Sequence, residues 1–470
     1  MAFYNYIFAR KHKGKFIVRI EDTDQSRLVP GTATEIEEIL EWAGLKPDES
    51  PTQGGPYGPY IQSQRLKLYR DKANELLESG KAYRCFCSSD RLDLLRKHQA
   101  RNREKIRYDR KCLHLTQKQI EQKLNENVGS HVIRLELKPG LTTFDDVVFG
   151  RVSTDLVSAM ESDPILLKSD KFPTYHLANV IDDHTMNISH VLRGLEWLSS
   201  TGKHVQIYRA FGWTMPQFAH FPLITMQDGK KMSKRDAESR VTSYIDSGYT
   251  PLAILNFLTS MGGGLPKAKL DSTDCWEINE IVEKFEFERV IRHPGSADLD
   301  RLNLYNSYDL RNKWDTNPEI IISQVRKLLA EHKLDSDLDD KSVSTIVNNF
   351  IRERIKTLND LVSPENKFVW RYQELNWPLD SYKGKGWNLK KIVQDVIELV
   401  DTDYTTDKTL FYQKLDKIAE THAMDRPVLL RMIRKLLTNR SSGLPIIEIF
   451  ECLGKERLKE YLIKGLDYVS

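Results

Sequence analysis

The stretch Asp228-Gly229-Lys230-Lys231-Met232-Ser233-Lys234-Arg235 places four cations within six residues. An Asp-Gly pair, typical of a flexible turn, opens it, and an apolar run from Phe221 to Ile224 precedes it. A loop of this kind can lay ammonium and guanidinium groups on a polyphosphate, where they stabilise the charge that develops as pyrophosphate leaves. A solvated surface turn is the alternative, because clusters of like charge are usually exposed.

The bulk composition is that of a globular chain with several domains. Its 470 residues are 40% hydrophobic and 29% charged, which is enough apolar material for real cores, and the length predicts about three domains. The net charge of +3 is small, so local patches would have to attract any RNA. No apolar stretch approaches the roughly 18 residues of a membrane span, and we expect no membrane partner. The five cysteines are few and odd in number, which indicates a reducing compartment.

The N-terminal residues predict part of a doubly wound α/β domain. Residues 3–8 carry a helical apolar stripe, and residues 16–20 read as a buried strand. Such a domain normally opens with a strand and a turn aimed at nucleotide phosphates, whereas this sequence begins within the helix that follows that turn. Next comes Arg19-Ile20-Glu21-Asp22-Thr23-Asp24, and acidic groups at the carboxyl end of a parallel strand lie where these folds bind ligands. The alternative is a helix N-cap for the helix expected at residues 32–43.

A second candidate site is Phe172-Pro173-Thr174-Tyr175-His176-Leu177-Ala178-Asn179-Val180-Ile181-Asp182-Asp183. This apolar helix also offers a phenol, an imidazole and an amide, and convergent polar groups are expected where a small charged ligand must be oriented. Taken singly, Tyr175 and Asn179 are equally explained as satisfied core residues. Arg193 ends the next predicted strand, where its guanidinium fork could bind a carboxylate bidentately. A structural salt bridge is the alternative for this arginine.

Two tight pairs of metal-binding side chains, Cys85-x-Cys87 and Cys112-x-His114, are separated by 24 residues. Three thiolates and an imidazole suit a closed tetrahedral zinc site, and unliganded thiols are the alternative. The segment 90–110 between the pairs is expected to be helical and to bring them together. Its basic run either contacts phosphates or forms a solvated face. The run consists of Arg101, Arg103, Lys105, Arg107, Arg110 and Lys111.

The remaining elements are predicted from periodicity. Short alternating runs at Val132–Leu135 and Val147–Gly150 indicate strands of the same inserted domain. Residues 62–79 have helical spacing, as do residues 237–258 with breaks at Gly248 and Pro251. Beyond residue 306 the pattern is helical only. The expected helices are 319–329, 343–361, 389–399, 410–419 and 428–437.

The loop Lys231–Arg235 resembles the signature loop of class I aminoacyl-tRNA synthetases. Its surroundings resemble the glutamyl-tRNA synthetase family of bacterial and mitochondrial type, on the residues Arg19–Asp24, Pro173–Ala178 with Asp182-Asp183, and Arg193–Trp197. The resemblance covers nearly the whole chain. It departs at one place, because the family's His-x-Gly-His signature occurs nowhere in the sequence, nor do the strand that carries it and an arginine that meets the amino acid. A misassigned start and a true truncation are both open.

The resemblance implies a role for each matching residue. The glutamate site is implied to contain Glu21, Tyr175, His176, Asn179, Arg193 and Trp197, with Glu21 facing the substrate's ammonium group. The ATP site is implied to contain Glu196, Lys231, Met232, Ser233, Lys234 and Arg235. Of these, Lys231, Lys234 and Arg235 are the catalytic cations. The zinc ligands Cys85, Cys87, Cys112 and His114 match an acceptor-stem insertion that some members carry.

The implied fold is α/β: a Rossmann-like nucleotide-binding domain, N-terminally incomplete, with an inserted α+β acceptor-binding domain and an all-α anticodon-binding part at the C-terminus. The expected domains are 1–80 and 166–236 for the two catalytic halves, 81–165 for the insertion, 237–306 for a helical stem-contact domain and 307–470 for the anticodon-binding domain.

The implied activity is ligation of L-glutamate to tRNA(Glu) through glutamyl-adenylate, using ATP with Mg²⁺. A structural Zn²⁺, a monomeric state and tRNA(Gln) as a second acceptor are further expectations. The rival hypothesis is a catalytically inactive tRNA-binding protein. Segments such as Asp48–Pro51 and Gly54–Pro59 resemble mitochondrial members, so the mitochondrial matrix is the expected location and the cytoplasm the alternative.

Overall fold

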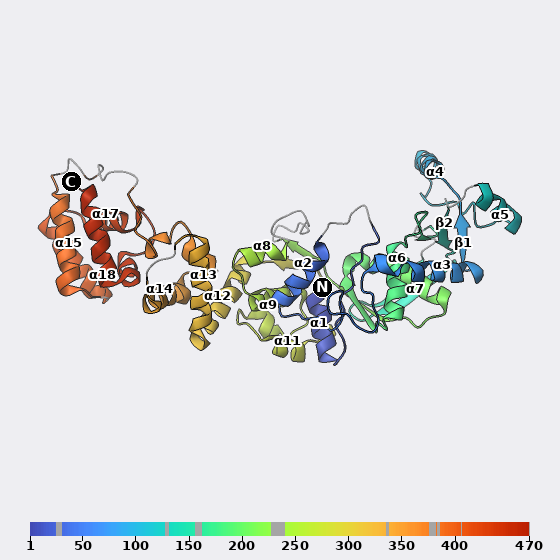
Figure 1. Cartoon of the computed structure of the whole chain (residues 1–470), viewed down its shortest axis with the longest axis horizontal. Helices are drawn as coiled ribbons and strands as arrows, with labels where there is room; N and C mark the ends of the chain where they lie inside the picture. The colour runs from blue at the N-terminus through green and yellow to red at the C-terminus, as the bar shows by residue number, and fades with distance from the viewer. Residues whose placement is uncertain are drawn as a thin grey trace. The chain divides into compact units, whose positions relative to one another are not determined.

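The computed structural model describes residues 1–24, 31–126, 131–155, 162–226, 240–334, 338–375, 382, 386–405 and 407–469. The chain forms two compact units (Figure 1). The first contains Met1–Val241 and Ile254–Leu299, and the second contains Thr242–Ala253 and Asp300–Ser470. The predicted boundary at residues 306/307 falls inside helix α12 (Leu299–Thr316), seven residues beyond the division between the units.

Among its described residues, the first unit has nine strands, and helices pack on both faces of its main sheet. Its helices are α1 (Ala2–Lys11), α2 (Thr32–Trp42), α3 (Leu66–Glu78), α4 (Ser89–Arg101), α5 (Gln117–Glu126), α6 (Tyr175–Thr185), α7 (Leu198–Phe211), most of α9 (Pro251–Gly262), α10 (Lys267–Asp271) and α11 (Ile278–Lys284). Its strands are β1 (Ala82–Cys85), β2 (Val132–Leu135), β3 (Leu141–Asp146), β4 (Gly150–Asp155), β5 (Ile165–Leu167), β6 (His190–Gly194), β7 (Gln217–Phe221), β8 (Ile224–Met226) and β9 (Gly295–Ala297).

The main sheet has the order β4-β3-β7-β6, with β6 and β7 parallel and Arg193 directly opposite His220. Side chains alternate across β7. Phe218 packs in the cluster with α3, α6 and α7, whereas Ala219 and Phe221 pack in the cluster with α1. By this alternation Arg193 and His220 point to the face that α6 and α7 cover. The register therefore carries two polar side chains into an otherwise apolar layer.

The strand predicted at residues 16–20 is wrong as a continuous strand. This segment forms two isolated parallel bridges, Ile17 with Glu49 and Ile20 with Ile61. The chain that should pair with it leaves through the Pro- and Gly-rich turn of residues 51–59 between the two bridges, so no continuous ladder forms. Phe16 and Val18 are nevertheless buried, as the apolar pattern predicted.

Two local predictions in the segment 81–165 are also wrong, namely the strand at residues 147–150 and the length of the helix at residues 90–110. Residues 147–149 form a turn rather than a strand, because Asp146 Oδ1 accepts the backbone N–H groups of Val148 and Phe149. The strands on either side, β3 and β4, pair with each other and join the main sheet through β7. The inserted part keeps a separate antiparallel sheet, β1-β2-β5.

Helix α4 is shorter than the helix expected over residues 90–110. It ends at Arg101, and Arg103 adopts a positive φ of 56°. The side-chain amide of Gln99 makes two hydrogen bonds with the backbone of Arg107, of 3.0 Å each. These bonds fold residues 102–107 back as a loop, and the loop replaces the continuing helix.

The second unit is helical, as predicted. Its helices are α8 (Val241–Asp246), α12, α13 (Pro318–Glu331), α14 (Asp340–Glu353), α15 (Leu389–Asp403), α16 (Lys408–Thr421), α17 (Arg426–Thr438) and α18 (Ile446–Gly465). Side-chain caps explain where three of these helices begin. The side chains of Asp339, Asn388 and Asp407 each accept a backbone N–H of the first turn of α14, α15 and α16, respectively. The apolar stripes of α13 to α18 meet in one large core. None of the helices in the described residues is both long and apolar enough to cross a bilayer.

Candidate active site

A cleft of about 760 Å³ lies in the first unit between α1, residues 14–21, α6 and β6. Four of the residues predicted to bind the amino acid line it: Glu21, Tyr175, Asn179 and Arg193. Side chains from three separate segments are thus brought to one cavity, although Glu21 and Arg193 lie 172 residues apart in the sequence.

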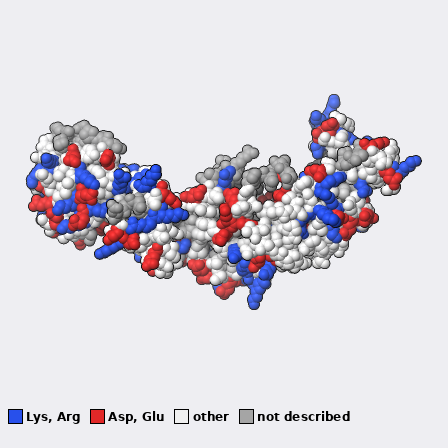
Figure 2. All heavy atoms as spheres, viewed as in Figure 1, with Lys and Arg blue, Asp and Glu red and all other residues white. Residues whose placement is uncertain are grey.

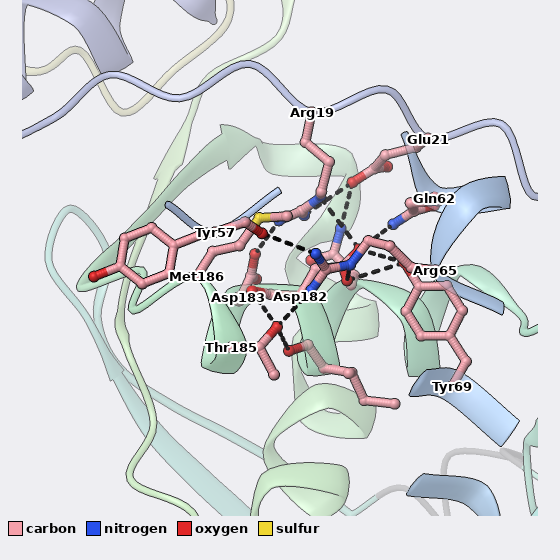
Figure 3. A network of polar contacts seen from close by, with 12 residues as sticks. Arg19, Glu21, Tyr57, Gln62, Arg65, Tyr69, Asp182, Asp183, Thr185 and Met186 are labelled. Atoms are coloured by element: carbon pink, nitrogen blue, oxygen red, sulfur yellow. Dashed lines mark hydrogen bonds and ion pairs between the residues drawn. The ribbon is translucent and has the colours of Figure 1, made fainter. Parts of the chain in front are cut away.

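Glu21 stands at one wall of the cleft, held by two donors (Figure 3). Its Oε1 accepts a 2.7 Å hydrogen bond from Asn179 Nδ2 and a 3.1 Å hydrogen bond from Arg19 Nη2. The Glu21 side chain remains 35% exposed, so its carboxylate is also available to a cationic ligand. Asn179, which alone could have been a core residue, acts here as the anchor of this carboxylate.

Arg19 ties the cleft to α6 (Figure 3). Its Nη1 donates to Asp183 Oδ1 at 3.0 Å, and its Nε lies 3.6 Å from Asp182 Oδ2. Burial by itself would lower the pKa of Arg19, but the carboxylates of Asp183, Glu21 and Asp182 raise it above its ordinary value. Arg19 therefore stays charged and sets the position of Glu21.

Behind Arg19, Asp182 is the hub of a fully buried network (Figure 3). Its carboxylate accepts hydrogen bonds from Arg65 Nε at 2.8 Å, Gln62 Nε2 at 2.9 Å and Tyr69 OH at 2.8 Å. The donors come from the 3-10 turn η2 (Gln62–Arg65) and from α3. The network fastens α6, and with it Asn179 and Asp183, to the neighbouring elements.

Arg193 occupies the opposite wall and is 8% exposed. Its Nη2 donates to Thr201 Oγ1 at 2.7 Å, its Nε to His220 Nε2 at 3.2 Å, and its Nη1 to Tyr175 OH at 3.5 Å. His204 Nδ1 lies 3.4 Å from Nη1. Within the described part of the chain, the groups that hydrogen-bond this guanidinium are uncharged in their ordinary forms, and no carboxylate pairs with it directly. A buried cation in this state calls for an anion from outside.

The remaining predicted residues form the support of Tyr175. The indole of Trp197 packs on the Tyr175 ring at 4.5 Å between centroids, and the ring of His176 lies 5.6 Å away. Burial, followed by the nearby Glu21 carboxylate, raises the pKa of Tyr175 to about 12, so the phenol keeps its proton. His176 faces His204, with Nδ1 and Nε2 3.0 Å apart, and burial lowers its pKa to about 4. His176 and Trp197 thus touch Tyr175, while the cleft itself is lined by the other four residues.

Glu196 and the cationic loop complete the predicted ATP site. Glu196 is exposed on the 3-10 turn η3 (Leu195–Trp197), directly after the strand that carries Arg193. The residues Lys231, Met232, Ser233, Lys234 and Arg235 lie outside the described residues. Together, the buried guanidinium of Arg193 and the carboxylate of Glu21 give the cleft charges that complement a ligand carrying both a carboxylate and an ammonium group.

The predicted zinc ligands fall into two groups. Sγ atoms of Cys85, Cys87 and Cys112 all lie within 4.8 Å of one another, and those of Cys87 and Cys112 are 3.7 Å apart. A tetrahedral zinc with Zn–S bonds of about 2.3 Å needs sulfur atoms about 3.8 Å apart, so the thiols fit the ion. His114, the fourth predicted ligand, is exposed and lies outside this group. Tyr108 OH faces the thiols instead, 3.3 Å from Cys85 Sγ and 3.7 Å from Cys87 Sγ.

Basic side chains are exposed on α4 and the loop after it, with acidic side chains among them (Figure 2). Arg101, Arg103, Lys105 and Arg107 are exposed, as a phosphate-contacting or solvated face requires. Arg110 differs, because its Nη2 donates to the buried Asp163 at 2.6 Å. Its role is therefore structural.

Comparisons with known proteins identify the family of each part of the chain. The family described as "tRNA synthetases class I (E and Q), catalytic domain" matches residues 1–304, and the family "Anticodon binding domain" matches residues 321–465. The fold and these two matches therefore define a class I aminoacyl-tRNA synthetase with a helical anticodon-binding domain.

Whole-chain relatives narrow the family. Glutamate–tRNA ligase of Borrelia recurrentis is 35% identical over 476 residues, covering 100% of this chain and 92% of the relative. Glutamate–tRNA ligase of Dehalococcoides mccartyi is 36% identical over 483 residues, covering 97% and 92%. A crystal structure of a glutamate tRNA ligase from Elizabethkingia meningosepticum in complex with its amino acid superposes with a TM-score of 0.83 at 28% identity, covering 100% of this chain and 96% of that one. The chain belongs to the glutamate–tRNA ligase family.

Sequence reasoning missed Arg19, Asp146, Thr201 and His220 as site residues. The sequence contains an indication for two of them, His220 and Asp146. His220 interrupts the apolar strand 217–221, and Asp146 ends the strand that precedes a turn. Because a buried polar side chain needs a partner, each could have been marked as half of an unidentified pair.

Proposed function

We propose that this protein activates L-glutamate with ATP and transfers it to tRNA(Glu). The observation that carries the proposal is one cleft with two charged walls. The buried Arg193 has no direct carboxylate partner among the described residues, and Glu21 stands on the other wall, held by Asn179 and Arg19. Arg193 with Tyr175 suits the side-chain carboxylate of glutamate. Glu21 suits the ammonium group.

The reaction has two steps. The α-carboxylate of glutamate attacks the α-phosphorus of Mg-ATP in line, and pyrophosphate leaves. The terminal ribose hydroxyl of tRNA then attacks the carbonyl of glutamyl-adenylate and AMP leaves. No covalent enzyme intermediate is needed, since catalysis rests on positioning and charge stabilisation. We assign Glu196 to ATP and Lys231, Lys234 and Arg235 to the leaving phosphates.

The test is glutamate-dependent exchange between ATP and pyrophosphate, measured with tRNA(Glu) present. We expect exchange with L-glutamate and none with L-leucine. Arg193→Lys should reduce kcat/KM for glutamate by roughly 10–100-fold, the equivalent of about 1.5–3 kcal/mol for a charged hydrogen bond. Background exchange together with normal tRNA(Glu) binding would favour the inactive tRNA-binding protein instead.

The finer expectations are part of the proposal and have separate tests. Charging of tRNA(Glu) and tRNA(Gln) transcripts in parallel decides whether a second tRNA is accepted. Sedimentation equilibrium tests the proposed monomer. Subcellular fractionation tests the proposed location in the mitochondrial matrix against the cytoplasm.

We also propose that the thiolates of Cys85, Cys87 and Cys112 hold one structural Zn²⁺, with Tyr108 OH at the fourth position. The sulfur separations support this assignment. The ion would close the loop after α4 onto β1, so that the basic side chains of this part are presented on an ordered surface. It takes no part in the ligation itself.

A further inference from the structure

Three neighbouring parallel strands carry one polar side chain each toward the glutamate cleft. Asp146 ends β3, His220 lies in β7 and Arg193 lies in β6. The pairing places Arg193 directly opposite His220, and Asp146 pairs with Phe218, two residues before His220. Asp146 is 3% exposed, His220 0% and Arg193 8%. A line of polar groups therefore crosses the sheet inside the protein and ends at the arginine.

The donor and the acceptor of each hydrogen bond along this line can be assigned in order, starting from Asp146. Asp146 Oδ1 accepts the N–H groups of Val148 and Phe149, and Oδ2 lies 2.6 Å from His220 Nδ1. An ionised carboxylate only accepts, so His220 Nδ1 must carry the proton. In the neutral ring His220 Nε2 is then an acceptor, and it receives the N–H of Arg193 Nε at 3.2 Å.

Two of these contacts occupy one edge of the Arg193 guanidinium. Nε and Nη2 share one edge of Arg193, and His220 and Thr201 take it. The Thr201 hydroxyl in turn donates to the carbonyl of Trp197 at 3.0 Å. A bidentate carboxylate would bind the edge formed by Nη1 and Nη2, where it would replace the 3.5 Å contact of Nη1 with the Tyr175 hydroxyl.

A second imidazole supports the same orientation from α7. His204 Nδ1 lies 3.4 Å from Arg193 Nη1, and His204 Nε2 lies 3.0 Å from His176 Nδ1. Burial, with Arg193 and His176 nearby, lowers the pKa of His204 well below its ordinary value. His204 is therefore uncharged beside the arginine and can accept its N–H.

We propose that Asp146 and His220 are positioning residues that hold the carboxylate-binding edge of Arg193 toward the cleft and so determine the affinity for the glutamate side chain. The inference rests on the proposed glutamate site. The specificity of Arg193 then depends on which ring nitrogen of His220, on the neighbouring strand, carries the proton. It also assigns a functional reason to two buried polar residues that packing alone would disfavour.

The decisive variant is Asp146→Asn. Asparagine keeps the shape and its oxygen can still cap the N–H groups of Val148 and Phe149, but its amide nitrogen then faces His220 Nδ1. The ring must accept there and carry its proton on Nε2, which points a donor at the N–H of Arg193. Asp145→Asn is the matched control, because Asp145 precedes it on the same strand and is exposed.

The measurement is calorimetric titration of the full chain with L-glutamate and, separately, with ATP. We expect Asp146→Asn and His220→Leu to raise the Kd for glutamate at least 10-fold and to leave the Kd for ATP within 2-fold. His220→Gln, whose amide can donate to Asp146 and accept from Arg193, should restore glutamate binding to within about 3-fold of the unchanged protein. Asp145→Asn should bind both ligands as the unchanged protein does.

Two results overturn the inference while leaving the proposed function intact. One is equal glutamate affinity in Asp146→Asn and Asp145→Asn. The other is a parallel loss of glutamate and ATP binding with a lowered Tm, which marks a merely structural role. The ¹⁵N shifts of His220 give an independent check, since a proton on Nε2 in the unchanged protein contradicts the argument. Absence of glutamate binding by the unchanged protein would overturn the proposed function and this inference together.

Discussion

Removal of the Asp182 carboxylate is the sharpest test of how the site is held. Asp182→Ala deletes the acceptor of Arg65, Gln62 and Tyr69, all inside the first unit. The Arg65 side chain is only 6% exposed and Asp182 is 0% exposed, so water cannot easily replace the lost partner. Breaking a buried ion pair by removing one partner costs about 3–5 kcal/mol.

The remaining contacts of Arg65 narrow the expected cost. Its other nitrogens still donate to the carbonyls of Tyr57 and Pro59 and to the hydroxyl of Thr185. We therefore expect a loss in the lower part of the range, about 3–4 kcal/mol. With an unfolding entropy of about 2.1 cal/mol/K per residue, this loss lowers the Tm of a unit of about 290 residues by roughly 5–7 °C.

Differential scanning calorimetry of the full chain measures this effect. Asp71→Ala is the control, because Asp71 is 58% exposed on α3 and pairs with Lys67 in a surface ion pair, which is worth about 0–1 kcal/mol. Asp182→Asn, which keeps one acceptor oxygen, should lose about half as much as Asp182→Ala. A Tm of Asp182→Ala within 2 °C of the control would refute the view that this network fastens α6 to its neighbours.

Three further predictions follow from the site. Burial lowers the pKa of His176 from 6.5 to about 4, so in this range the unfolded chain takes up a proton that the folded chain does not. The free energy of unfolding therefore decreases as the pH falls from about 6.5 to about 4. His176→Gln should show a smaller fall in Tm between pH 7 and pH 5 than the unchanged protein. Cys112→Ser should lower the zinc content measured by mass spectrometry from one ion per chain to near zero, whereas His114→Ala should keep it; the opposite pattern would restore His114 as a ligand. Glu21→Gln removes the charge that faces the ammonium group and should weaken glutamate binding by roughly 10–100-fold in calorimetry, with unchanged affinity contradicting the assignment.

Local patterns predicted most of the helices correctly. The stripes at residues 319–329, 389–399, 410–419 and 428–437 all lie within observed helices, since apolar spacing is a property of near neighbours. The wrong predictions at residues 147–149 and at the end of α4 have causes that the apolar spacing does not reveal. The turn at residues 147–149 is made by one aspartate side chain, and the end of α4 by one glutamine, and neither leaves a mark in the apolar pattern.

The sequence by itself determined the family, the helical second unit and four residues that line one cleft, because motifs and periodicity are encoded in adjacent positions. Only the tertiary structure decided that Tyr108 rather than His114 faces the thiols, and that Asp146 reaches Arg193 through His220. Asp146 and His220 are 74 residues apart, and strand register alone makes them neighbours. Hydrogen bonds of this range depend on how the sheet is assembled, which no local pattern records.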